Sequence, residues 1–355
     1  MSAIESLEQL IDHAMQVQAQ GDVAGAICIL DKVIEVYPDH RMARTQRGRL
    51  RLKTGDFAAG ATDFEYFYRG QLPSQKGIFA NPDGSLKRLD GQHIIIASDA
   101  GLGDLVQFVR YGVLMKSLGA KVTVECGPAF HALCRNSVWI DQSLPQQDLG
   151  FDFASLGFAH RVPLHNLFAA FGTTLDTIPA YPSYLRASSK KIRLRRDGAI
   201  DGKARIGISW RSANESASVW KQGRSIDLPL LAEAFDPTRQ QLVCLQKEIS
   251  VDEQAFIRRH GGIVLPAPPL EDLDDTAAVM ATLDLVVSTC TVTPHLSGAL
   301  GIPTLLLLSR NACWRWMTEG TGSPWYPSLT LLRQDQFGDW TPVVESLRRL
   351  LACVN

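Results

Sequence analysis

The sequence predicts an α/β protein in which a short all-α segment precedes two successive halves of alternating strands and helices. The first 70 residues carry a pattern that repeats after 34 residues, and from residue 93 onward short apolar runs alternate with stretches of helical periodicity. Strands separated by helices pair in parallel through right-handed crossovers. At 355 residues the chain is also longer than one core usually supports, so we expect several domains.

The composition is that of an ordinary folded protein and argues against two function classes. Lys and Arg total 36 against 37 Asp and Glu, which gives a net charge of -1 and no basic surface for broad nucleic-acid binding. The longest apolar run, residues 302–308, is too short for a transmembrane segment, and acidic residues near the start argue against a signal peptide. We therefore expect a cytoplasmic protein whose seven irregularly spaced cysteines are reduced and bind no metal.

Residues 1–70 carry a repeat typical of tetratricopeptide motifs. Gly21-Asp22-Val23-Ala24 recurs as Gly55-Asp56-Phe57-Ala58, which gives the 34-residue period of that motif. A free array usually needs about three repeats. With only two, this segment should pack on the following domain or on a partner protein. Residues 71–90, rich in turn formers, are interpreted as a linker.

The first α/β half covers residues 91–190. Within it, Gly101-Leu102-Gly103-Asp104 lies between an apolar run and a helical pattern, so it places a carboxylate at the carboxyl end of a strand, where open α/β sheets bind ligands. Capping and the helix dipole alone also favour an aspartate at a helix start. The expected strands are residues 93–98, 121–125 and 151–153, and the expected helices are residues 105–118 and 129–134.

The second α/β half covers residues 203–335 and follows a polar, basic break. A last helix is expected within residues 338–355. Two sequential α/β halves create a cleft between them, which is a usual place for a ligand. The expected strands are residues 206–210, 242–245, 262–265, 285–288 and 304–308, and the clearest helices are residues 276–283 and 294–300.

Polar and basic residues follow the first two strands of this second half. Arg and Lys side chains that converge at the carboxyl edge of a sheet would suit a diphosphate. Solvated loop charges explain the same residues equally well. The candidates are Arg211, Lys221, Arg224, Gln246 and Lys247.

The stretch from Ser288 to Gly301 leaves a buried strand, turns through hydroxyl residues and enters a helix near Pro294. Exposed amides at that helix start, beside Thr291, form a natural anion site, and His295 would lie in the first turn. A packing histidine and simple capping by threonine are the alternatives.

Three other patterns favour structural explanations. Cys290 at a helix start could be a nucleophile, but no third group orients it with His295. The acidic run 271–275 could bind a metal ion, although acids at a helix N-terminus explain it better. Trp314-Arg315-Trp316 could stack on a base or a sugar, or simply pack against Trp325-Tyr326.

Taken together, these motifs resemble bacterial tetratricopeptide-repeat proteins that carry a heptosyltransferase-like glycosyltransferase domain of family 9. The resemblance spans nearly the whole chain, in order, and its most specific part is the Trp-Arg-Trp run followed by Ser323-Pro324-Trp325-Tyr326-Pro327. It implies a GT-B fold of two Rossmann-like domains, an acceptor domain first and a nucleotide-sugar donor domain second, with the last helix packing back.

The resemblance also implies roles for single residues. Asp104 matches the general base that activates the acceptor hydroxyl, and Thr291 and His295 match positions that contact the diphosphate of the donor. Such enzymes use a nucleoside diphosphate sugar as substrate and no bound metal or other cofactor. The acceptor-side loop would comprise Asp99, Gly101, Gly103 and Gln107.

One position departs from the family pattern. Cys290 stands where the family usually has aspartate, which puts donor identity or activity in question. Two hypotheses follow. The chain is a glycosyltransferase whose repeats recruit a protein or another acceptor, or it is an adaptor that has lost catalysis and binds proteins through its repeats.

Overall fold

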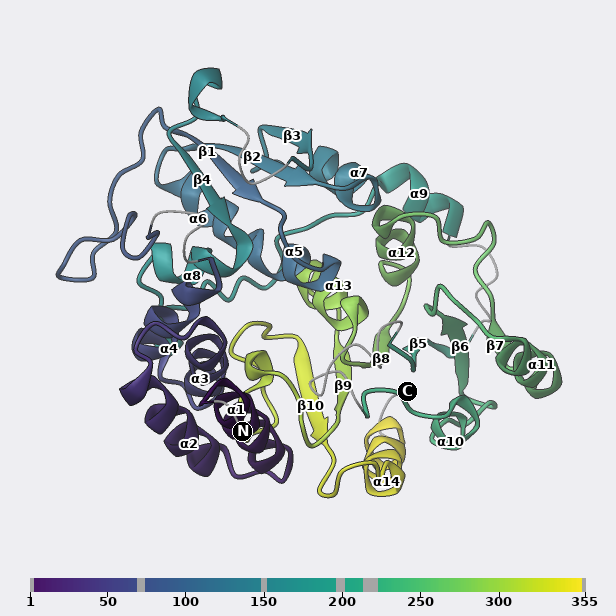
Figure 1. Ribbon diagram of the computed structural model, residues 1–355. Coiled ribbons are helices and arrows are strands. Elements are labelled where there is room, and N and C mark those ends of the chain that lie inside the picture. Colours follow the sequence, from purple (N-terminus) through teal and green to yellow (C-terminus); the bar gives the residue numbers. More distant parts are fainter. Residues whose placement is uncertain (1–2, 69–73, 148–151, 196–201, 213–222, 353–355) are drawn as a thin grey trace.

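The computed structural model describes residues 3–68, 74–147, 152–195, 202–212 and 223–352. A helical segment is followed by two α/β domains, each built on a parallel sheet with helices on its faces (Figure 1). This is the expected fold class, an all-α segment followed by a GT-B arrangement of two Rossmann-like domains.

The helical segment consists of two antiparallel hairpins whose turns the repeated Gly-Asp pair makes. The Asp22 carboxylate accepts from the Gly25 amide at 2.7 Å, and Asp56 accepts from Ala59 at 3.0 Å, so each aspartate caps a helix start. At Gly48 a Cβ would lie 2.9 Å from the Phe64 amide nitrogen, so only glycine allows this helix contact. The helices are α1 (Ala3–Ala19), α2 (Val23–Val36), α3 (Arg41–Lys53) and α4 (Phe57–Phe64), followed by the 3-10 turn η1 (Glu65–Tyr68).

The first sheet has the order β3-β2-β1-β4 and is parallel throughout. Its strands are β1 (His93–Ala97), β2 (Lys121–Cys126), β3 (Gln142–Pro145) and β4 (His160–Pro163). Ile94, Ile95 and Ile96 are all fully buried, because helices cover both faces of the sheet. The helices of this domain are α5 (Leu102–Phe108), α6 (Arg110–Ser117), α7 (Pro128–Asn136), α8 (Leu167–Ala170) and α9 (Ser189–Arg195).

Two predictions for this domain were wrong. Residues 152 and 153 form no strand, and two strands of the sheet, β3 and β4, were not predicted. The sequence of β4, His-Arg-Val-Pro, lacks the expected apolar run. The single helix predicted over residues 105–118 is two helices that meet at Val109. Here the buried Arg110 side chain donates to the Gln107 carbonyl at 2.7 Å, an acceptor that an unbroken helix would use internally.

The second sheet has the order β7-β6-β5-β8-β9-β10, the strand order of a complete Rossmann fold. Its strands are β5 (Ala204–Ser209), β6 (Gln240–Cys244), β7 (Ile263–Val264), β8 (Leu285–Thr289), β9 (Thr304–Leu308) and β10 (Leu329–Arg333). The helices are α10 (Leu228–Ala232), α11 (Val251–His260), α12 (Leu273–Met280), α13 (Val292–Leu300) and α14 (Thr341–Leu351).

The last helix, α14, packs on its own domain. Its buried residues Val343, Val344, Leu347 and Leu351 join the core beneath the second sheet, together with Trp340. The last helix was expected to pack back on the preceding domains. In the structure it packs against β10 and α10 of the second domain.

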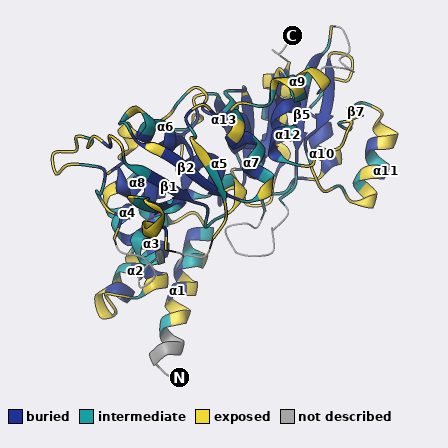
Figure 2. Ribbon diagram, turned by 90° about the horizontal axis from the view of Figure 1, so that it is seen from above, coloured by how far each residue is buried: buried dark blue, intermediate teal, exposed yellow. Residues whose placement is uncertain are grey.

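The helical segment shares one core with both α/β domains. Phe57 of α4 lies edge-on to Phe168 of α8 and to Trp314, with both ring centroids 6.4 Å away, and it also contacts Trp325. Figure 2 shows buried residues running from the helical segment through both sheets. The second repeat therefore packs on the following domains, which fixes its position relative to the cleft, while α1, α2 and part of α3 form a core of their own.

Candidate functional site

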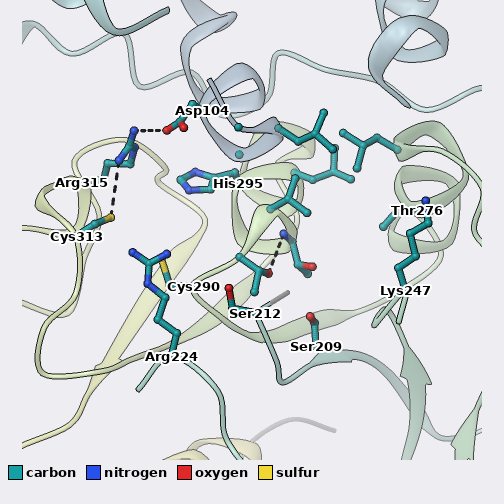
Figure 3. Close-up of a pocket in the computed structure, with 18 of the residues that line it drawn as sticks. Asp104, Ser209, Ser212, Arg224, Lys247, Thr276, Cys290, His295, Cys313 and Arg315 are labelled. Atoms are coloured by element: carbon teal, nitrogen blue, oxygen red, sulfur yellow. Dashed lines mark hydrogen bonds and ion pairs between the residues drawn. The ribbon is translucent and has the colours of Figure 1, made fainter. Parts of the chain in front are cut away.

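A cavity of about 900 Å³ lies where the carboxyl ends of the two sheets face each other. Both sheets contribute at the point where their strand order reverses, which is where α/β folds bind ligands. Asp104 and His165 follow β1 and β4 of the first sheet, while Arg211 and Cys290 follow β5 and β8 of the second. All four residues line the cavity, and Figure 3 shows Asp104 at one end and Lys247 at the other.

Asp104 is held by a side chain from the opposite domain. It lies in the first turn of α5, and its Oδ1 accepts a hydrogen bond from Nη2 of Arg315 (Figure 3). The same oxygen lies 3.5 Å from Nε2 of His165. Burial favours the neutral acid, but the charges of Arg315 and His165 outweigh it and hold the pKa of Asp104 well below its usual range. Asp104 is therefore ionised, and both of these contacts use Oδ1.

Arg315 is itself fixed from two sides. Its Nε donates to Oε1 of Gln107, which is fully buried, and Nη1 lies 4.0 Å from the Cys313 sulfur. Gln107 therefore does not line the cavity, as an acceptor-loop residue would, but orients the arginine that holds Asp104.

The start of α13 faces the cavity from the second domain. Thr291 is the N-cap, and its hydroxyl accepts from the Thr293 amide at 3.2 Å. His295 stacks on Trp316 with a centroid distance of 5.1 Å, and its Nδ1 lies 2.8 Å from the Tyr326 hydroxyl. Burial, reinforced by the charge of Arg315, lowers the pKa of His295 to about 3, so the imidazole is neutral at pH 7. A Cβ at Gly103 would lie 3.1 Å from this ring, so glycine lets α5 and α13 meet closely.

Arg224 lines the second-domain side of the cavity, beside Cys290. It points toward the space that His295 and Cys290 also face (Figure 3). Its Nε is buried and has no hydrogen-bond partner within the part of the chain that the structure describes. A buried guanidinium donor without an acceptor is costly, which makes Arg224 the clearest candidate for binding an anion.

Three other predicted donor residues line the cavity but have protein partners. Arg211 forms an ion pair with Glu253 at 3.1 Å, and Lys247 donates to the Glu271 carbonyl at 3.2 Å. The side-chain Oε1 of Gln246 accepts from the Trp210 and Arg211 amides, so this side chain shapes the end of β5. Lys221 lies outside the described residues.

Cys290 is not placed to act as a nucleophile. Its sulfur accepts from the Trp316 indole N–H at 3.1 Å, and it also hydrogen-bonds with Cys313. That bond, together with burial, raises the pKa of Cys290, whereas the same bond and the charge of Arg315 lower the pKa of Cys313. The sequence singled out Cys290, whereas Cys313 is the cysteine of the pair that lies beside the Arg315 guanidinium.

Asp99 and the acidic run have structural roles. Asp99 Oδ1 accepts from the Leu164 amide at 3.2 Å, and Asp99 is not among the residues that line the cavity. Asp272 caps α12 through the Asp275 amide, and Lys191 pairs with both carboxylates. Within the described residues, no cluster of three His, Cys, Asp or Glu side chains is arranged to hold a metal ion.

Sequence reasoning missed His165 and the partnership of Arg315 with Asp104. His165 follows β4, a strand that could not be predicted because it lacks an apolar run. Arg315 belongs to the Trp-Arg-Trp run, which was interpreted through its tryptophans, and these two indoles are buried packing residues. Gly101, in contrast, is the N-cap of α5 and lines the cavity, as expected of the glycine turn.

No family model matches the chain. It is 24% identical over 390 aligned residues to the protein FlbA of Caulobacter vibrioides, an alignment that covers 91% of this chain and 63% of that protein. The chain thus spans less than two thirds of the curated relative's length. None of the helices formed by the described residues is long and apolar enough to cross a bilayer.

Solved structures share the fold. A family 9 glycosyl transferase from Veillonella parvula matches with a TM-score of 0.52 and 10% identity, covering 70% of this chain and 87% of that chain. The ADP-heptose lipopolysaccharide heptosyltransferase II of E. coli matches with a TM-score of 0.49 and 12% identity, covering 74% of this chain and all of that chain. Because the identity is only 10%, the match to the Veillonella protein shows a shared GT-B fold and nothing further.

Proposed function

We propose that this chain is a glycosyltransferase that moves a sugar from a nucleoside diphosphate sugar to a hydroxyl of a protein or glycan acceptor, without a bound metal ion. The observation that carries the proposal is the cavity itself. It joins an ionised Asp104 at one switch point to a helix start and to Arg224 Nε, which has no partner among the described residues, at the other. The shared fold with a family 9 glycosyl transferase supports it.

The second domain would hold the diphosphate. The amides at the start of α13 and the Arg224 guanidinium supply positive electrostatic potential where the leaving group gains charge. His295 is neutral, and a Tyr326 hydroxyl that donates to Nδ1 leaves the imidazole proton on Nε2. That N–H is a further donor for a phosphate oxygen. These groups would stabilise the departing diphosphate without a metal ion.

The first domain would activate the acceptor. The acceptor hydroxyl would donate to Oδ2 of Asp104, because Arg315 and His165 contact Oδ1. As the hydroxyl oxygen bonds to the anomeric carbon, its proton passes to Asp104 and the bond to the diphosphate breaks, with the electron pair leaving on the phosphate oxygen. Arg315 keeps the carboxylate ionised before the reaction and fixes its orientation.

A panel of nucleoside diphosphates tests the donor half of the proposal. A ligand that binds only the folded state raises its melting temperature. We expect one of ADP, UDP, GDP or CDP to stabilise the full-length protein, and calorimetry to give one site per chain. If none of the four raises the melting temperature, the donor site is absent.

A second function is favoured by the sequence at position 290 and by the Asp104 ion pair. Cysteine replaces the expected carboxylate, and Asp104 is already bonded within the protein. In this alternative the chain is an adaptor that binds a partner protein through its repeats. Partner binding without any nucleotide binding would support it.

A further inference from the structure

We propose that the helical segment forms part of the acceptor site, and that Arg49 of α3 binds an anionic group, a carboxylate or a phosphate, next to the acceptor hydroxyl. This inference rests on the proposed function, because it concerns the acceptor end of the same cavity. It changes the role of the helical segment from recruiting an acceptor at a distance to contacting it at the reacting end.

Three side chains of the helical segment line the cavity. Gln46 and Arg49 come from α3 and Phe64 from α4. They reach it because α3 packs against the turn η7 (Trp314–Trp316), which carries Arg315. Figure 1 shows α3 and α4 beside the loop that precedes β10.

The position of this segment is fixed by packing. At Gly55, in the turn between α3 and α4, a Cβ would lie 3.6 Å from the Met317 methyl group, and Phe57 lies against Trp314 and Trp325. Phe64 in turn lies edge-on to His165, with ring centroids 5.4 Å apart. The same aromatic contacts therefore hold the helical segment and the residue that neighbours Asp104.

Arg49 lies within the electrostatic reach of the proposed base. Burial and then the positive charge of Arg315 lower the pKa of Arg49, while Asp104 and Cys313 raise it. Two guanidinium groups thus share this end of the cavity with the Asp104 carboxylate. An anionic group on the acceptor would relieve the repulsion between the two cations, which is how a site of this charge selects its ligand.

The Arg49 side chain is also oriented for recognition. Its guanidinium carbon lies 5.8 Å from the centroid of the Phe64 ring, and Nη1 donates to Oε1 of Gln46 at 3.4 Å. A guanidinium supported on an aromatic ring presents a planar pair of donors that matches a carboxylate or a phosphate. The phenyl ring beside it offers an apolar contact for the rest of the acceptor.

Small probes test this subsite without knowledge of the acceptor. We would use ligand-observed NMR on the full-length protein, without nucleotide, with two matched pairs. These are the peptide amide Gly-Ser-Asp against Gly-Ser-Asn, and glucose 6-phosphate against glucose. At least one anionic probe should bind about tenfold more tightly than its neutral partner. Which pair responds identifies a peptide carboxylate or a phosphorylated sugar as the source of the anion.

Variants locate the effect. Arg49→Gln should remove the preference for the anionic probe, Arg49→Lys should keep part of it, and Lys32→Gln, an exposed change on α2, should leave it intact. Nucleoside diphosphate binding, measured separately, should be the same in all three variants and in the wild type. If the wild type binds no nucleoside diphosphate but keeps the preference for the anionic probe, the proposed function is overturned and Arg49 remains an anion-binding residue.

The inference is overturned if the wild type binds neither anionic probe, if it does not prefer either anionic probe over its neutral partner, or if Arg49→Gln keeps the preference. The comparison of probes on the wild type stays decisive even if Arg49→Gln does not fold.

Discussion

The two ends of the cavity differ in how far the protein satisfies its own polar groups. At the first-domain end, the Asp104 carboxylate is bonded by Arg315 from the opposite domain, and Gln107 orients that arginine. At the second-domain end, Arg224 Nε lacks a partner within the described residues, and the start of α13 faces the cavity. One end is assembled before a ligand arrives, and the other offers donors to an incoming anion.

The two ends of the cavity are also built from different parts of the molecule. The Asp104 end draws on the helical segment and on both α/β domains, since Arg49, His165 and Arg315 come from the three of them. The α13 end consists of second-domain residues alone. Changes in the helical segment should therefore affect acceptor chemistry and leave nucleotide binding unchanged.

The largest effect is expected from Asp104→Asn. An amide cannot take a proton from the acceptor, and loss of a general base typically lowers turnover by about 10²–10⁴-fold. Nucleoside diphosphate binding should stay within about twofold, because Asp104 bonds to Arg315 and not to the groups proposed to hold the diphosphate. The measurement is turnover of nucleotide sugar beside calorimetry with the nucleoside diphosphate.

The matched control is Asp252→Asn, an exposed acid on α11. Turnover by Asp104→Asn equal to that of this control would remove Asp104 from the chemistry. A parallel loss of nucleotide binding would show that the two ends are not separate.

Phe57→Ala tests whether the helical segment supports only the Asp104 end. The Phe57 side chain is 1% exposed and packs between Phe168, Trp314 and Trp325. Removing a buried phenyl ring costs about 3–5 kcal/mol of unfolding free energy. Denaturant unfolding should show this loss, and turnover should fall while nucleotide affinity is retained in the folded protein. If the fully folded variant binds nucleotide more weakly than the wild type, the helical segment also supports the α13 end.

Arg224→Gln tests the α13 end. Loss of a charged donor to a phosphate should weaken nucleoside diphosphate binding by about tenfold to a hundredfold. The exposed Arg258→Gln on α11 is the control. Calorimetry that gives equal affinities for the two variants would exclude Arg224 from the donor site.

The smallest effect concerns His295 and pH. Its pKa is lowered to about 3 in the folded protein, against about 6.5 in the unfolded chain. As the pH falls, His295 is protonated in the unfolded chain before it is protonated in the folded protein. Its contribution to the free energy of unfolding is therefore complete above pH 6.5 and is lost as the pH falls toward 3. At pH 5 the loss amounts to about 2 kcal/mol.

Unfolding measured at pH 7 and pH 5 should show a smaller loss for His295→Gln than for the wild type. An NMR titration that places the His295 pKa near 6.5 would contradict this environment and the neutral imidazole on which the donor site depends.

The sequence predicted most of the fold because buried parallel strands are almost continuously apolar. Ile94–Ile96 and the run at residues 304–308 could be assigned directly for that reason, and Asp22 and Asp56 marked their helix starts. β4 could not be found this way, because His160 and Arg161 read as loop residues. Its edge position needs only Val162 and Pro163 to be buried.

The candidate site was predictable only where chain neighbours form it. The glycine turn, Asp104 and the start of α13 each lie within one short motif. Arg315 and Asp104 are 211 residues apart in the chain, and Arg49 comes from a segment that periodicity describes as a repeat. The sequence groups Asp99 and Gln107 with Asp104 by proximity alone. Asp99, in the loop before α5, accepts from the Leu164 amide, whereas Gln107 on α5 accepts from Arg315.

The central claim is that a sugar crosses this cavity from a nucleotide to an acceptor hydroxyl. The most direct measurement is mass spectrometry of the full-length protein incubated with a nucleotide-sugar mixture and a host lysate. We expect an acceptor to gain the mass of one sugar residue while the matching nucleoside diphosphate is released. Nucleoside diphosphate binding without any such mass increase would contradict the claim and leave the adaptor function.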